Sequence, residues 1–134
     1  MNSVESVRKL CLCFPHATEQ VQWGYDLVFK IGGKMFAITP LEPAPVFLTF
    51  KATDESFAEL TERQGIIPAP YLARAKWVAL ERADAVSPQE LASLLRLSYD
   101  LVFARLSRKT RDALASTKRK RKPSPSEPKS RRRK

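Results

Sequence analysis

The sequence predicts an α+β domain of two layers, an antiparallel sheet with helices on one face. Three patterns point to this class. Apolar residues recur at helical spacing near both ends of the body of the chain, alternating segments flank a Gly-Gly turn between them, and the regular strand–helix alternation of a parallel sheet is absent. The predicted order is α-β(3)-α-β(1–2)-α.

A first helix is expected over residues 3–14, with Ser3 as its N-cap and Pro15 at its end. The two cysteines of the chain, Cys11 and Cys13, point about 200° apart on such a helix, so they neither pair easily nor share a metal. We expect one thiol in or near the core and the other at its margin. The apolar positions of this helix are Val4, Val7, Leu10, Cys11 and Phe14.

β structure is expected from about residue 20, where Val21, Trp23 and Tyr25 alternate with polar residues and glycine. It leads into a hairpin whose turn is Gly32-Gly33, because glycine accepts a positive φ at little steric cost. A two-residue turn opposes three pairs, Ile31 with Lys34, Phe29 with Phe36, and Leu27 with Ile38. One face then carries Leu27, Phe29, Ile31, Phe36 and Ile38, and the other carries Asp26, Val28, Lys30, Met35, Ala37 and Thr39.

The middle of the chain is expected to add a strand, a helix and a further strand. In order these are residues 46–51, 55–64 and 76–81. Thr53 or Asp54 can cap the helix, and Gly65 ends it. The segment Pro68-Ala69-Pro70 favours an extended loop before the last strand.

The last long helix has the clearest start. Ser87 can cap it, Pro88 suits its first position, and Glu90 completes a capping box. A short helix over about residues 108–115 follows. The long helix runs to about Leu106, and its expected buried residues are Leu91, Leu94, Leu95, Ser98, Val102 and Leu106.

Positive charge is concentrated at the C-terminus. Residues 117–134 carry ten Lys or Arg and one acid, whereas residues 1–116 carry fourteen basic and thirteen acidic side chains. We therefore expect a domain over residues 1–116 and a basic tail over residues 117–134, disordered when free because like charges repel. Such a tail is suited to bind the phosphates of DNA, and RNA is the alternative partner. The plainer interpretation is an extension that only increases solubility. Its candidate contacts are Lys118, Arg119, Lys120, Arg121, Lys122, Arg131, Arg132, Arg133 and Lys134.

Several short motifs follow one another in a characteristic order. They are Phe14-Pro15, Trp23-Gly24, the run from Phe29 to Ala37, Phe50-Lys51, the run from Pro68 to Leu72, Lys76-Trp77-Val78 and Ser98-Tyr99. On these motifs the chain resembles the MmcQ/YjbR family over about residues 3–115. The resemblance implies a two-layer domain with an antiparallel sheet, similar to the secretion-chaperone-like fold. Members are commonly described as DNA-binding proteins with a double-winged surface, and typical members end near the last helix, so the basic tail is a departure.

Basic residues beside the predicted strands can extend a DNA contact. The candidates are Lys34, Lys51, Arg74 and Lys76, and the aromatic residues between them are Trp23, Tyr71 and Trp77. In the alternative interpretation the rings belong to the core and the lysines protect strand edges from aggregation. For Trp23 and Trp77 the core is favoured.

A non-enzymatic protein is expected. His16 stands alone without a nucleophile motif, Gly32-Gly33 lacks the residues of a phosphate-binding loop, and no metal or cofactor is expected. No apolar run approaches the roughly 20 residues that span a bilayer, and no signal peptide is evident. These features predict a cytoplasmic protein, with the nucleoid as a candidate location and a monomer favoured. The alternative is a module that binds a protein or small ligand, which a pocket lined by Trp23, Tyr71 and Trp77 would favour.

Overall fold

The computed structural model describes residues 2–121, with side chains described as far as residue 115. Its strands form one antiparallel sheet in the order β1-β2-β3-β4-β6-β5. The strands are β1 Thr18–Gln22, β2 Asp26–Ile31, β3 Lys34–Pro40, β4 Leu48–Lys51, β5 Ile66–Pro68 and β6 Trp77–Leu80. The helices are α1 Val4–Leu12, α2 Asp54–Leu60, α3 Pro88–Ala104 and α4 Arg108–Arg121, with the short 3-10 helices η1 Ala73–Ala75 and η2 Ala83–Ala85. The predicted α+β class is confirmed.

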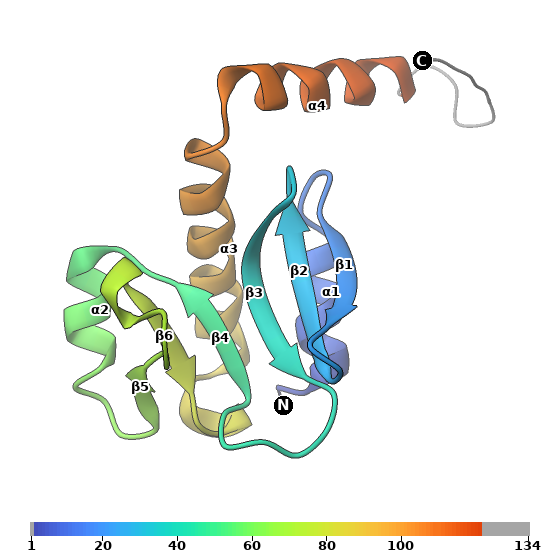
Figure 1. The fold of residues 1–134 in the computed structure, drawn as a ribbon. Helices are drawn as coiled ribbons and strands as arrows, with labels where there is room; N and C mark the ends of the chain where they lie inside the picture. The colour runs from blue at the N-terminus through green and yellow to red at the C-terminus, as the bar shows by residue number, and fades with distance from the viewer. Residues whose placement is uncertain (1, 122–134) are drawn as a thin grey trace.

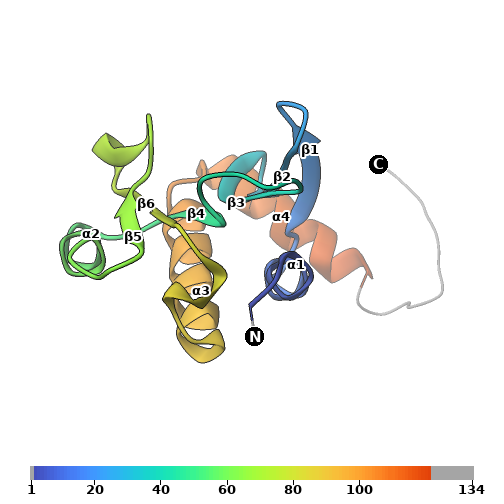
Figure 2. The ribbon, with the colours of Figure 1, turned by 90° about the horizontal axis from the view of Figure 1, so that it is seen from below.

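Helices α1 and α3 cover one face of the sheet, and no α-helix of residues 2–121 covers the opposite face, which we call the open face (Figures 1 and 2). Helix α2 lies beside β5 and β6, and α4 crosses the end of the sheet at which the β2–β3 turn lies (Figure 1). The hairpin of β1 and β2 and the segment around β5 and η1 stand at opposite sides of the open face (Figure 2).

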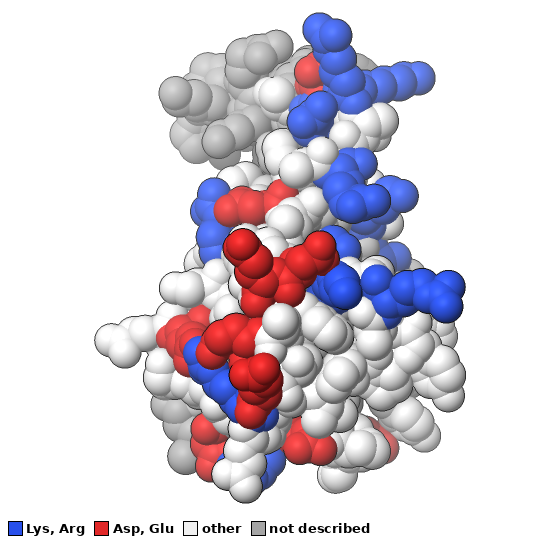
Figure 3. All heavy atoms as spheres, turned by 90° about the vertical axis from the view of Figure 1, so that its left-hand side faces the viewer, with Lys and Arg blue, Asp and Glu red and all other residues white. Residues whose placement is uncertain are grey.

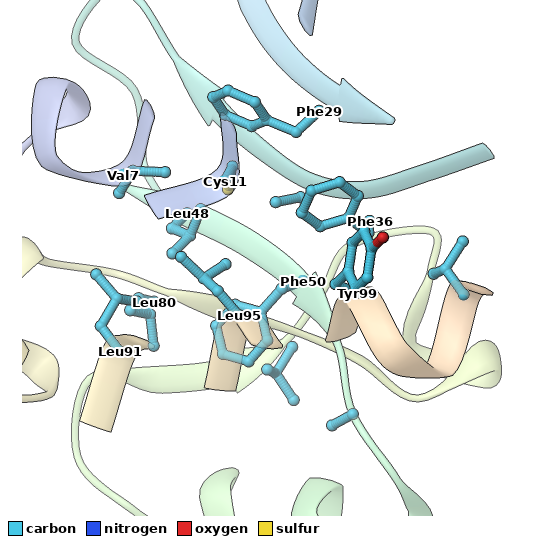
Figure 4. Packing of buried hydrophobic residues seen from close by; sticks show 14 of the residues in the cluster. Val7, Cys11, Phe29, Phe36, Leu48, Phe50, Leu80, Leu91, Leu95 and Tyr99 are labelled. Atoms are coloured by element: carbon cyan, nitrogen blue, oxygen red, sulfur yellow. The ribbon is translucent and has the colours of Figure 1, made fainter. Parts of the chain in front are cut away.

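The core lies between the sheet and the two helices (Figure 4). Val7 and Cys11 come from α1, whereas Cys13 is exposed, as expected of the two thiols. The Phe36 and Tyr99 rings pack edge to face at 5.4 Å between their centroids. The labelled contributions of the sheet and α3 are Phe29, Phe36, Leu48, Phe50, Leu80, Leu91, Leu95 and Tyr99. Aromatic and branched side chains at native packing provide most of the stabilisation of a domain this small.

The β2–β3 register differs from the prediction beyond the first two pairs. Ile31 opposes Lys34 as expected, but Phe29 opposes Ala37 and Val28 opposes Ile38, so the predicted pairs of Phe29 with Phe36 and Leu27 with Ile38 are wrong. The cause is a β-bulge that leaves Phe36 without a partner on β2. Past the bulge the alternation along β3 shifts by one, which brings Ala37 into the core cluster and turns Ile38 to the open face.

The strand expected around residues 20–25 is split by a turn. Gln22 pairs with Asp26, so the three residues between them close a hairpin. Trp23 and Gly24 occupy the left-handed region, with φ of 52° and 88°. The structure thus has four strands before α2 where three were predicted.

The helix boundaries are close to those predicted, with two differences. Ser3, Thr53 and Ser87 cap α1, α2 and α3 through their side-chain oxygens. The capping box expected from Glu90 is wrong, because the Glu90 carboxylate instead bonds to Arg63 on the segment after α2. Helix α4 ends at Arg121 rather than near residue 115.

Candidate nucleic-acid interface

The centre of the open face is the junction of β3 and β4. These strands share only two residue pairs, Ala37 with Phe50 and Ile38 with Thr49. The bulged residue Phe36 directly precedes the paired residues Ala37 and Ile38 of β3. The two halves of the sheet can therefore diverge, and side chains of the open face line the space between them.

A groove of about 380 Å³ lies over this junction, and we call it the open-face groove. Met35 and Ile38 of β3 and Thr49 of β4 line it, together with the carboxylate residue Asp26. Its volume is at the lower end of the range for small-molecule sites. The groove is mostly apolar and carries few polar groups, which suits a flat ring better than an ion.

Two exposed aromatic residues border the groove. Trp23, from the β1–β2 turn, is 64% exposed, and Tyr71, from the segment before η1, is 101% exposed. Both also have a positive φ, 52° for Trp23 and 66° for Tyr71. The prediction that Trp23 belongs to the core is wrong, because the turn points its ring away from the sheet's helical face.

Trp77 does not line the groove and is buried, as favoured. It packs in a second, smaller cluster with Ala69 and Ala79. The pocket foreseen for an interaction module thus contains two of its three predicted rings, Trp23 and Tyr71.

Three of the four predicted basic residues of the body, Lys51, Arg74 and Lys76, lie together. Arg105, which was not predicted, lies near Lys51. Lys51 donates a 2.8 Å hydrogen bond to the carbonyl of Ala75 in η1. Lys76, directly after η1, places its ammonium group 5.1 Å from the centroid of the Phe57 ring. We call the set the Lys51 patch, and its members are Lys51, Arg74, Lys76 and Arg105.

Burial lowers the pKa of Lys51, and the positive charge of nearby Arg105 lowers it further, while Asp54 opposes the shift. The fold therefore places the positive charges of Lys51 and Arg105 close together. An anion bound here would relieve that repulsion.

Lys34 is exposed beside the β2–β3 turn. That turn contacts the start of α4, because Gly32 lies against Leu106 and Thr110. Figure 3 shows Lys and Arg gathered from the top of the molecule, where α4 lies, down one edge of the view, with Asp and Glu beside them.

Ion pairing separates the cations of the described side chains into two classes. Arg8, Arg63, Arg82 and Arg96 each lie within 3.1 Å of a carboxylate. None of the ion pairs found among residues 2–115 includes Lys34 or a member of the Lys51 patch. Lys34 and the patch residues are thus among the cations that remain available to an external anion.

The candidate contacts of the C-terminal run lie at the limit of the described chain. The backbone of Lys118, Arg119, Lys120 and Arg121 continues α4, so the first residues assigned to the tail are helical. Lys122, Arg131, Arg132, Arg133 and Lys134, and with them the expected disorder, lie outside the described residues.

The comparisons with known proteins agree with the motifs. The family model described as YjbR matches residues 12–101. The chain belongs to the YjbR family. The MmcQ/YjbR resemblance is thereby confirmed, and the matched region contains the residues that line the open-face groove and the patch residues Lys51, Arg74 and Lys76.

Two solved structures resemble the fold. A Deinococcus radiodurans protein with a DUF419 domain is 31% identical, with a TM-score of 0.77 over 86% of this chain and 89% of its own. A Pseudomonas syringae protein is 19% identical, with a TM-score of 0.59 over 75% of this chain and 98% of its own. No curated protein matches the chain.

Residues 2–121 offer neither a membrane-spanning helix nor a cluster of metal ligands. None of the helices in that part of the chain is long and apolar enough to cross a membrane. Within the same residues, no three His, Cys, Asp or Glu gather where they could hold a metal ion.

Sequence reasoning missed Arg105 and the pairing of Trp23 with Tyr71 across a groove. Arg105 is the C-cap of α3, and its sequence context does not distinguish it from other cations at helix ends. A signal for the two rings was present, because Trp23 precedes a glycine and Tyr71 follows a proline, and both contexts favour turns.

Proposed function

We propose that this protein is a non-enzymatic DNA-binding protein of the cytoplasm, associated with the nucleoid. The Lys51 patch and the basic C-terminal run would contact backbone phosphates, and the monomer is the binding unit. The single observation that carries the proposal is the patch itself, a group of cations that have no ion-pair partner among the described side chains and in which Arg105 repels Lys51. Phosphates are the anions that such a group meets along DNA.

The absence of catalysis is part of the proposal. Perturbed carboxylates often mark active sites. Here the lowered pKa values of Glu19, Asp84 and Glu90 each come chiefly from a hydrogen bond to an arginine. These three lie outside the open-face groove, so they support structural ion pairs rather than acid–base chemistry.

The test is DNA binding as a function of salt, by gel shift and fluorescence anisotropy. If the patch and the run together neutralise six to eight phosphates, the slope of log K against log salt is about −5 to −7. A chain shortened to residues 1–116 should bind more weakly with a smaller slope. Replacing Lys51 and Lys76 by Gln in the full chain should reduce the slope by about 2.

Arg82→Gln is the matched control, because Arg82 is exposed, paired with Asp84 and outside the patch. It should leave the slope unchanged. Undiminished binding by residues 1–116 would contradict the role of the C-terminal run. No binding by any form of the chain would refute the proposal.

A further inference from the structure

We propose that the open-face groove holds unpaired bases of a single-stranded nucleic acid, with Trp23 and Tyr71 as stacking partners. This rests on the proposed function, because the neighbouring Lys51 patch would hold the phosphates of the same strand. It goes further by naming an unpaired strand as the ligand class of this face.

The conformation of the two rings is the first argument. Trp23 and Tyr71 are large apolar side chains left in water, 64% and 101% exposed. Both are also held in the left-handed backbone region, which costs a residue with a Cβ roughly 1–2 kcal/mol. Stability alone favours neither feature, whereas strained and exposed aromatic residues at the rim of a groove are typical of ligand clamps.

The floor of the groove is the second argument. Met35 and Ile38 offer an apolar surface for a flat ring. Asp26 and Thr49 add oxygen atoms that can accept hydrogen bonds from the exocyclic amines of bases. The carboxylate of Asp26 also repels phosphate, so the bases and not the backbone would enter the groove.

Charge continuity is the third argument, and it favours a nucleic acid over an apolar peptide. Thr49 and Lys51 lie on the same side of β4, about 7 Å apart along the strand, because side chains alternate. At the other rim the chain passes from Tyr71 to Arg74 within three residues. A strand with its bases in the groove would therefore run its phosphates past the patch.

Only unpaired bases meet these requirements. A duplex keeps its ring faces stacked inside the helix, whereas a single strand can place each face against an aromatic side chain. The ring-to-ring arrangement across the groove thus selects single strands over duplexes, while the patch alone does not.

The experiment measures affinity by anisotropy with the full-length chain and three labelled probes of equal length. These are a mixed-sequence single strand, the corresponding duplex, and an abasic strand that keeps the phosphates without the bases. Trp23→Ala and Tyr71→Ala should each weaken binding of the single strand between about fivefold and about a hundredfold, the range expected from loss of base–aromatic stacking. Neither should change binding of the abasic strand.

Tyr25→Ala is the matched control, since Tyr25 is 58% exposed on the same turn as Trp23 and does not line the groove. It should behave as the unsubstituted chain. Trp23→Phe keeps a stacking ring and should retain affinity within about threefold. Because the other tryptophan, Trp77, is buried, binding of the base-containing strand should quench the Trp23 emission, and Trp23→Phe should lose that quenching.

The outcomes separate the two proposals. Equal affinity for the base-containing and abasic strands, with no quenching, overturns the groove proposal and leaves phosphate binding intact. No binding of any probe refutes the proposed function, and the groove proposal with it. If an acidic peptide of equal charge binds with the same dependence on Trp23 and Tyr71, the groove is a protein site and the proposal is wrong.

Discussion

The Ser98 hydroxyl of α3 donates a 2.6 Å hydrogen bond to the backbone carbonyl of Phe36 in β3. The same oxygen accepts a 2.9 Å bond from the backbone N–H of Lys51 in β4. Both backbone groups lie just beyond the two-pair junction of these strands. The Ser98 side chain thus satisfies two backbone groups that have no partner in the β3–β4 pairing. These groups lie at the base of the open-face groove and the Lys51 patch.

Replacement of Ser98 by Ala should destabilise the fold by about 1–3 kcal/mol, because a buried carbonyl and a buried N–H lose their partner. The measurement is the midpoint of urea unfolding at unchanged m-value. Ser93→Ala is the control, since Ser93 is exposed on the same helix, and it should be neutral within about 0.5 kcal/mol. Equal stability of the two variants would show that the bridge contributes nothing.

The two glycines of the β2–β3 turn should respond differently to alanine. Both have a positive φ, 61° at Gly32 and 83° at Gly33, so each alanine costs about 1–2 kcal/mol in backbone strain. A Cβ at Gly32 would also lie 2.8 Å from Leu106, whereas one at Gly33 meets nothing within 4 Å. Gly32→Ala should therefore cost on the order of 1–3 kcal/mol more, measured by thermal unfolding of both variants.

A result in which Gly33→Ala is the more damaging change would contradict this contact between the turn and the α3–α4 connection. Loss of helical signal only in Gly32→Ala, by circular dichroism, would show in addition that the turn positions the start of α4.

The cysteines should differ in reactivity. Burial raises the pKa of the Cys11 thiol, and a thiol that stays protonated is unreactive. Cys13 is exposed on the last turn after α1. One equivalent of a thiol reagent should react rapidly with the native protein, and a second only after unfolding. Cys13→Ser should abolish the rapid phase, and a rapid phase that survives in that variant would contradict the packing of Cys11.

Local patterns predicted most of the secondary structure but not the bulge. Nothing in the alternation around Phe36 distinguishes a continuous strand from one with an extra residue, and the Phe36 carbonyl accepts a hydrogen bond from Ser98, 62 positions away. The shift at Phe36 then decides which face Ile38 occupies. Tertiary bonds of this kind override local pairing rules.

The candidate site was predicted in part for the same reason. Lys51 and Lys76 were identified from their places beside strands, and the fold brings them together through pairing of β4 with β6. Trp23 was assigned to the core because buried rings dominate small domains, and the turn conformation that exposes it appears only once Gln22 is paired with Asp26. Arg105, the C-cap of α3, lies close enough to Lys51 to lower its pKa, and no spacing in the sequence indicates this proximity.

The ion pair of Arg63 and Glu90 ties the segment after α2 to α3 and should make stability depend on pH. The Arg63 guanidinium lies 2.8 Å from the Glu90 carboxylate and holds the pKa of Glu90 below its ordinary value, mainly through this hydrogen bond. A lowered folded-state pKa means that the unfolded chain binds the proton more tightly. The stabilisation is therefore present above the unfolded pKa of about 4.3 and is lost as pH falls through the lower folded value.

Glu90→Gln should destabilise the protein at neutral pH by about 1 kcal/mol or less, because both side chains are about one-third exposed and solvent screens the pair. The difference from the unsubstituted chain should shrink as the pH is lowered, since protonation of Glu90 removes the same charge. Urea unfolding over a series of acidic buffers measures it. Glu62→Gln removes an exposed carboxylate outside the ion pairs found among residues 2–115, and should give a smaller difference at neutral pH. A Glu90→Gln penalty that persists unchanged in acid would mean that the carboxylate acts by packing rather than by charge.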